Sequence, residues 1–368
     1  MYKIIGRGIV AGDYEFDVDR KDYNHIRKVN WTHNGEWKHP GQAVMKTLTD
    51  ITDYTDYVGK LNALFEIEEA EEEKSKDFES YDESDFLSEV FISAEKYKTI
   101  VNLLERKKNI ILQGAPGVGK SYAAKRLAYS IIGEKNTDQV KVVQFHQSYS
   151  YEDFIVGFRP SEDDNKQFEK KYGVFYEFCK KAIDDGDNDY FFIIDEINRG
   201  NMSKIFGELL LLIESDKRGK GNKLQLLYSN EEFYVPENVY IIGMMNTADR
   251  SLALIDYALR RRFAFVEFEP AFESDGFKQV QERINNKKYN SLIECVKQLN
   301  KAISDDYSLG KGFQIGHSYF VPENNSNIDD VWLENVVDYE LIPLLEEYWF
   351  DETDKLENWR KKLKDAIK

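Results

Sequence analysis

One run of eight residues has the composition and spacing of a phosphate-binding loop. It matches G-x-x-x-x-G-K-[ST], in which glycines let backbone N–H groups wrap phosphates, the lysine reaches the β- and γ-phosphates, and the hydroxyl binds Mg²⁺. The run follows an apolar stretch and opens a helical pattern, whose positive N-terminal end also attracts phosphate. We therefore predict a nucleotide site made by Gly114, Ala115, Pro116, Gly117, Val118, Gly119, Lys120 and Ser121.

Two adjacent acids, Asp195 and Glu196, end a second apolar stretch. We expect Asp195 to hold Mg²⁺ together with Ser121, directly or through water, and Glu196 to orient and polarise the attacking water. Two acids after a strand can also form a simple turn. The phosphate-binding loop upstream favours the catalytic interpretation.

The run from Met244 to Phe265 gathers three further polar groups within about two secondary-structure elements. They are a polar pair, an acid–base pair and an arginine cluster: Asn246 with Thr247, Asp249 with Arg250, and Arg260, Arg261 and Arg262. Such groups could sense a nucleotide and connect it to other parts of a machine.

The arginine cluster is placed at a predicted helix end, just before a strand. An arginine supplied by a neighbouring subunit can neutralise charge on the γ-phosphate during hydrolysis. The alternative is a basic helix C-terminus that complements the helix dipole. Three consecutive residues cannot share one helix face, so at least one should point elsewhere. We predict Arg261 and Arg262 as the residues that act on the neighbouring subunit.

Short, nearly continuous apolar runs alternate with helical patterns through the middle of the chain, as expected for strands buried on both faces of a parallel sheet. This predicts an α/β fold with a five-stranded parallel sheet, whose strands are 109–113, 140–145, 190–195, 239–244 and 264–268. Helices are expected at 121–132 and 203–214, and a small hairpin at 223–228 and 232–235. After Pro270 only amphipathic helices are predicted, at 291–303, 330–347 and 354–367, which suggests a helical lid.

Length and composition point to a multidomain protein of the cytoplasm. The chain has 368 residues, enough for two or three domains. It has no signal peptide and no apolar run that could cross a bilayer, and Cys179 and Cys295 lack metal-ligand spacing. A net charge of −17 argues against non-specific coating of DNA, although a local DNA contact stays open.

We divide the chain into four segments. Residues 1–62 are predicted to be β-rich, with strands around Tyr14, Phe16 and Val18 and around Val29 and Trp31, but too short to bury a good core alone. Residues 63–90 hold an acidic linker, since residues 66–89 contain twelve acids and two lysines. Residues 91–269 form the nucleotide-binding core, and residues 270–368 form the lid.

These motifs, in this order, resemble the AAA+ class of ring-forming NTPases, and within it the McrB family. The segments that carry the closer resemblance cover the chain from about Phe86 onward: Asp195–Gly200 (DEINRG), Ser203–Glu208, Met245–Ser251 (MNTADRS), Gln144–Phe154 and Ile315–Phe320. The McrB family supplies the motor subunit of McrBC-type modification-dependent restriction systems.

The resemblance implies a GTPase that uses Mg²⁺, assembles as a hexameric ring, and drives a McrC-like nuclease. It implies that Asn246 is a sensor near the γ-phosphate, and that Asp249 and Arg250 couple hydrolysis to the neighbouring subunit or to the active-site acids. The preference for GTP over ATP rests on resemblance alone, because the N-K-x-D tetrapeptide that reads guanine is absent. The alternatives are a MoxR-like ATPase that remodels protein clients and a catalytically inactive scaffold.

The N-terminal segment resembles the later part of an EVE (PUA-like) domain, through Ile9–Phe16 and Ile26–Trp31. Members of that class read modified bases after base flipping. A complete domain needs about twice this length, so we expect any DNA contact to use an N-terminal domain that is incomplete here.

Overall fold

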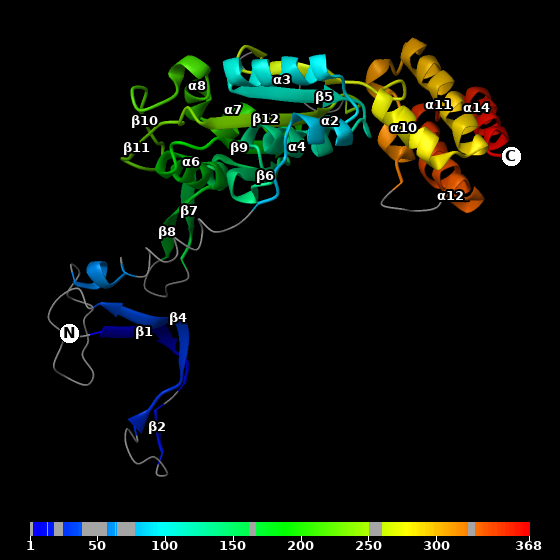
Figure 1. Ribbon diagram of the computed structural model, residues 1–368. Coiled ribbons are helices and arrows are strands. Elements are labelled where there is room, and N and C mark those ends of the chain that lie inside the picture. Colours follow the sequence, from blue (N-terminus) through cyan, green and yellow to red (C-terminus); the bar gives the residue numbers. More distant parts are fainter. Residues whose placement is uncertain are drawn as a thin grey trace. The chain divides into compact units, whose positions relative to one another are not determined.

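The computed structural model describes residues 3–12, 14–17, 25–38, 57–62, 64, 78–161, 167–249, 260–322 and 328–368. The chain divides into two compact units, Met1–Asp77 and Phe78–Lys368 (Figure 1). The second unit contains the predicted nucleotide site and is described first. Within the described ranges, no helix has the length and apolar character needed to cross a bilayer.

Five parallel strands form the central sheet of the second unit. They are β5 (Asn109–Gly114), β6 (Val140–Gln144), β9 (Tyr190–Asp195), β12 (Val239–Asn246) and β13 (Ala264–Phe268). Their order across the sheet is β13-β5-β12-β9-β6, so the predicted five-stranded parallel sheet is confirmed. Because the strands are parallel and β12 lies between β5 and β9, the carboxyl ends of these three strands lie side by side. Open α/β sheets bind their ligands at the carboxyl ends of their strands.

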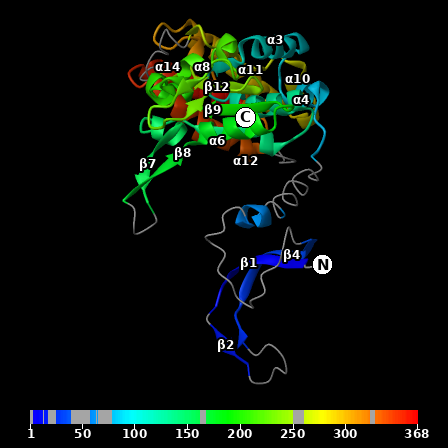
Figure 2. The same cartoon turned by 90° about the vertical axis from the view of Figure 1, so that its left-hand side faces the viewer.

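Apolar side chains alternate between two cores, one on each face of the sheet. The helices that cover the two faces are α2 (Glu83–Glu89), α3 (Ala94–Lys107), α4 (Lys120–Ile132), α5 (Tyr151–Phe154), α6 (Val174–Asp184), α7 (Met202–Phe206) and α8 (Leu209–Leu212). In β5, Ile110 and Leu112 enter the core under α2, α3 and α4, whereas Ile111 enters the core under α5, α6, α7 and α8. Figures 1 and 2 show α3 and α6 on opposite sides of the strands.

Two details of this core differ from the prediction. The helix expected over 203–214 is broken into α7 and α8, because Gly207 adopts a left-handed φ of 50°. The predicted hairpin exists as β10 (Leu224–Gln225) and β11 (Glu232–Phe233). A second hairpin was not predicted, and it consists of β7 (Val156–Pro160) and β8 (Phe168–Tyr172).

The lid is helical, as predicted, and has its own core around Tyr289 and Trp349, both fully buried. Its helices are α10 (Asp275–Ile284), α11 (Lys287–Asp305), α12 (Asp330–Asn335), α13 (Ile342–Tyr348) and α14 (Thr353–Ala366), with short 3₁₀ turns η4 (Lys311–Phe313) and η5 (His317–Phe320). The helix expected over 330–347 contains a π turn, η6 (Val336–Leu341), between α12 and α13. Pro343 lacks an N–H and so cannot continue the α-helical hydrogen bonds at this point.

The second unit begins at Phe78, whereas the predicted linker extended to residue 90. Residues 78–90 belong to the second unit, where α2 packs the fully buried Phe86 into the core. Asp82 caps α2, and the acids Glu83 and Asp85 lie in its first turn, where they complement the positive helix end. The acidic composition was therefore misleading here, because these acids start a helix.

The first unit contains two antiparallel strand pairs. β1 (Lys3–Val10) pairs with β4 (Val29–Lys38), and β2 (Glu15–Phe16) pairs with β3 (His25–Ile26). The half-buried strand expected around Phe16 is only two residues long, Phe16 is 55% exposed, and Val18 lies outside the described residues. None of the described residues of this unit is buried, as expected for a segment too short to form a core.

Candidate nucleotide site at the carboxyl edge of the sheet

Three strand ends bring the predicted site residues together. Gly114 ends β5 and pairs in register with Asn246, which ends β12. Asp195 ends β9, the strand on the other side of β12. The loop, the acid pair and the polar residue Asn246 therefore lie along one edge of the sheet, although they are far apart in the sequence.

The phosphate-binding loop has the backbone that its glycines permit. Gly117 and Gly119 have φ values of 75° and 80°, which residues with a side chain rarely adopt. Helix α4 begins directly after Gly119, so its N-terminal end faces the loop. The loop is therefore shaped to receive an anion.

Lys120 is buried at the base of this loop. Its Nζ donates hydrogen bonds to the carbonyl oxygens of Gly114 (3.0 Å) and Ala115 (2.8 Å). Burial lowers its pKa to about 8, although the carboxylates of Glu196 and Asp195 oppose this shift. A triphosphate would favour the charged form further, because it brings negative charge to the ammonium group.

The acid pair is held in an unusual backbone conformation. Glu196 is a non-glycine residue with φ 50° and ψ 45°, and its N–H donates to Asp195 Oδ1 at 3.0 Å. Asn246 Nδ2 donates to Glu196 Oε1 at 2.8 Å. Backbone conformations of this kind are costly and are often found at functional sites. Together these contacts fix the direction of the Glu196 carboxylate, which is only 13% exposed.

Arg199 was not predicted as a site residue, but it connects two residues that were. Its Nε lies 3.2 Å from Glu196 Oε2 and its Nη2 lies 3.2 Å from Asp249 Oδ2. The spacing of three residues from Glu196 within the 3₁₀ turn η2 (Ile197–Arg199) could have indicated this pair. Asp249 is thus linked to the acid pair through Arg199, while Arg250 lies outside the described residues.

The donors predicted for Mg²⁺ suit that ion. Ser121, in the first turn of α4, offers a hydroxyl oxygen, and Asp195 offers a carboxylate. Mg²⁺ is commonly bound by one or two such oxygens, with phosphates and water completing its shell. The described part of the chain has no group of three or more His, Cys, Asp or Glu side chains that could hold a metal alone. The pair fits a magnesium ion that arrives with the nucleotide.

The lid contacts the phosphate-binding loop through its backbone. Ser318 N donates to Gly117 O at 2.9 Å, and Gly316 N donates to Pro116 O at 3.2 Å. Thr247 provides a second connection, because its N–H donates to Gly114 O and its Oγ1 donates to Gly312 O at 3.3 Å. No role was predicted from the sequence for the two lid glycines, Gly312 and Gly316. They let the lid approach the loop closely enough for the two to touch.

Models of known families match three parts of the chain. Residues 109–263 match the AAA domain of the dynein-related subfamily, residues 291–357 match the α-helical lid domain of McrB, and residues 1–55 match a domain of unknown function. Over 295 residues the chain is 52% identical to the type IV methyl-directed restriction enzyme EcoKMcrB subunit of Escherichia coli (strain K12), a match that covers 77% of this chain and 63% of that protein.

The chain belongs to the McrB family. It spans 63% of the length of the E. coli relative. It is also 26% identical over 306 residues to the type II restriction enzyme BsuMI component YdiS of Bacillus subtilis (strain 168), covering 71% of this chain and 85% of that protein. The resemblance to McrB is thus confirmed for the core and lid, whereas the EVE-like character of the first unit stays a prediction.

In this McrB-family chain the two arginines predicted to reach a neighbouring subunit have different surroundings. The side chain of Arg261 is 68% exposed and that of Arg262 is 10% exposed, and both place Nη2 2.8 Å from Glu214 Oε1. This differs from the prediction for Arg262, because its guanidinium is buried against its own subunit. Arg261 is accessible to another molecule.

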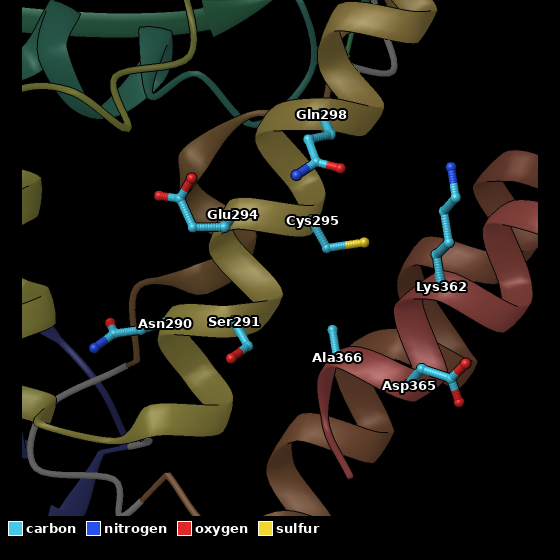
Figure 3. Close-up of a pocket in the computed structure, with 8 residues that line it drawn as sticks. All are labelled: Asn290, Ser291, Glu294, Cys295, Gln298, Lys362, Asp365 and Ala366. Carbon is cyan, nitrogen blue, oxygen red and sulfur yellow. The ribbon is translucent and has the colours of Figure 1, made fainter.

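A groove in the McrB-type lid lies apart from the nucleotide site. It runs between α11 and α14 and is lined by Glu294 and Cys295 on one side and by Lys362 and Asp365 on the other (Figure 3). None of the predicted site residues lines it. The predicted phosphate site therefore lies outside this groove, at the carboxyl edge of the sheet.

The burial of His317, near the contact between the lid and the loop, leads us to expect a free energy of unfolding that depends on pH. Burial among aromatic rings lowers its pKa from 6.5 to about 4, and its Nδ1 accepts the N–H of Ala271 at 3.1 Å. Between pH 6.5 and about 4, His317 binds a proton more readily in the unfolded chain than in the folded chain. The free energy of unfolding should therefore fall as the pH falls through this range. We expect a loss of about 2 kcal/mol from pH 7 to pH 5 attributable to His317.

Urea denaturation at the two pH values measures this effect. His317→Asn keeps an acceptor for the Ala271 N–H but cannot titrate, so the loss between pH 7 and pH 5 should shrink by that amount. His146→Asn, at an exposed position, is the matched control and should leave the loss unchanged. Equal pH dependence in His317→Asn and in the unmodified chain would contradict the assignment.

Proposed function

We propose that this chain is the nucleotide-hydrolysing motor of a DNA restriction system, that it acts as a ring, and that GTP is its substrate. Support comes from the McrB lid match, from the 52% identity to a subunit of a methyl-directed restriction enzyme, and from the intact site. The GTP assignment follows the family. The described site residues favour neither base.

The observation that carries the proposal is the hydrogen bond from Asn246 Nδ2 to Glu196 Oε1 at 2.8 Å, next to a buried Lys120. In this proposal Glu196 accepts a proton from the water that attacks the γ-phosphorus, and this attack breaks the bond to the β,γ-bridging oxygen. Lys120 and the loop N–H groups stabilise the charge on the phosphates. Ser121 and Asp195 would hold Mg²⁺, which would supply positive charge to neutralise the phosphates.

The proposal includes three partners. Copies of the same chain form a ring, for which a hexamer is expected, and Arg261 of one copy acts at the nucleotide of the next. A McrC-like nuclease subunit binds the ring and accelerates hydrolysis. DNA is contacted through the N-terminal domain to which residues 1–62 belong. A MoxR-like role in remodelling protein clients receives no support from the McrB lid match.

Steady-state hydrolysis of GTP and of ATP, with and without the McrC-like nuclease, tests the proposal. We expect GTP to be hydrolysed with the higher kcat/KM, turnover per subunit to rise with protein concentration as rings form, and the nuclease to stimulate turnover. Faster hydrolysis of ATP would reject the GTP assignment alone. A nuclease that neither binds nor stimulates would reject the restriction role.

A further inference from the structure

A buried arginine outside the predicted phosphate site, Arg218, contacts residues that also touch the arginine cluster. Arg218 is only 4% exposed, and its guanidinium donates hydrogen bonds to Asn109 Oδ1 (2.7 Å) and to the carbonyl oxygens of Ile213 (3.1 Å), Pro236 (3.4 Å) and Val239. All four acceptors are uncharged. Burying a cation costs free energy that such acceptors offset only when several are placed around it. The arrangement therefore fixes the position of Ile213 and Asn109.

These two residues in turn hold the arginine cluster. Asn109 is fully buried, and its Nδ2 donates to Ile213 O (2.8 Å) and to Arg262 O (3.1 Å). From the helix that precedes β5, Lys107 Nζ donates to Arg261 O at 3.3 Å. The backbone of both arginines is thus attached to the start of β5.

Glu214, which follows Ile213, holds the side chains of the same two arginines. Its Oε1 lies 2.8 Å from Nη2 of both Arg261 and Arg262, and its side chain is only 16% exposed. One carboxylate facing two guanidiniums leaves net positive charge at this surface. Immobilising an exposed arginine costs up to about 2 kcal/mol of side-chain entropy. Ordering the exposed Arg261 would contribute little to the stability of the fold. We therefore look for another role for this ordering.

We propose that Asn109, Arg218 and Glu214 form an arginine clamp, which positions Arg261 to act at the nucleotide of the neighbouring subunit. This inference rests on the proposed ring hydrolase. The three residues of the clamp are positioning residues, because they act through Arg261 and Arg262. Fixing a reacting group in advance removes an entropic cost from the reaction itself. A defect in the clamp should therefore appear in the next subunit's site, while its own site stays intact.

Mixed rings test this placement. Glu214→Gln keeps the shape but removes the charge that orients Arg261, and Arg261→Ala removes the guanidinium itself. We expect each to lower kcat for GTP about ten-fold or more, with little change in KM. Glu196→Gln subunits keep an intact clamp but cannot hydrolyse. When Glu196→Gln and Glu214→Gln subunits are mixed, turnover per Glu214→Gln subunit should rise several-fold above that of rings made of Glu214→Gln alone. Wild-type subunits mixed with Glu196→Gln in the same proportion serve as the reference and should show no such rise.

Two further variants separate positioning from folding. Asn109→Asp keeps an acceptor for Arg218 but loses the donor to Arg262 O, so it should behave as Glu214→Gln does in the mixed rings. Glu105→Gln, at an exposed position on α3, is the matched control and should keep full turnover and the same midpoint of thermal unfolding. Full turnover in Glu214→Gln rings would overturn the clamp. So would a loss that mixing fails to restore, because the defect would then lie in the variant's own site.

The outcomes also separate the clamp from the proposed function. If wild-type turnover does not depend on ring formation, the proposed ring hydrolase fails, and the clamp fails with it. If wild-type turnover depends on ring formation, Glu196→Gln rings are inactive, and only the mixed rings fail to recover, the clamp alone is wrong.

Discussion

Replacing Glu196 by glutamine should reduce nucleotide hydrolysis by about 10² to 10⁴-fold while leaving nucleotide binding intact. Glutamine preserves the volume of the side chain and can still accept the hydrogen bond from Asn246 Nδ2. It cannot accept the proton of the attacking water, so only the chemical step should suffer. Single-turnover hydrolysis and equilibrium titration with a fluorescent GTP analogue measure the two effects separately.

Glu237→Gln supplies the control, because Glu237 is exposed and lies outside the site. It should match wild type in both assays. A Glu196→Gln chain that hydrolyses GTP at the wild-type rate would remove Glu196 from its role. A chain that loses binding as well would show that Glu196 contributes mainly to the shape of the site.

Gly316→Ala should disrupt the nucleotide site from the lid. A Cβ on Gly316 would lie 1.9 Å from the carbonyl carbon of Gly117 and 2.5 Å from Val118 N, both backbone atoms that cannot rotate away. Forcing the lid and the loop apart should cost about 1–3 kcal/mol, which corresponds to a loss of GTP affinity of about ten-fold to a hundred-fold. Calorimetric titration with a non-hydrolysable GTP analogue measures it.

Gly221→Ala is the matched control. No atom lies within 4 Å of the position its Cβ would take, and Gly221 does not have a left-handed φ. It should bind nucleotide as wild type does. Normal GTP affinity in Gly316→Ala would mean that the contact between the lid and the loop does not constrain the nucleotide.

The parts of the fold and site that the sequence predicted are those that depend on local patterns. Continuous apolar runs predicted all five strands, because strands buried on both faces admit few polar residues. The loop around Lys120 and the acids Asp195 and Glu196 were predictable, because each needs a particular residue type at a fixed distance from a strand end.

The parts that the sequence could not predict depend on contacts between distant residues. Arg199 joins Glu196 to Asp249 only because two strand ends meet. Nothing in the order of three arginines shows that Glu214 holds Arg262 in a buried position. The acids of α2 were taken for a linker, because composition cannot distinguish a charged helix start from a solvated segment.

The position of β5 bears on how hydrolysis in adjacent subunits of the proposed ring could be coordinated. It carries Asn109 at one end and Gly114 at the other, a separation of roughly 17 Å along a strand that is hydrogen-bonded on both sides. A shift of β5 along its own axis moves the phosphate loop and the support of the arginines by the same amount. In a ring, β5 would then connect the nucleotide of one subunit directly to the arginines that face the next subunit. No series of intermediate rearrangements would be needed between them.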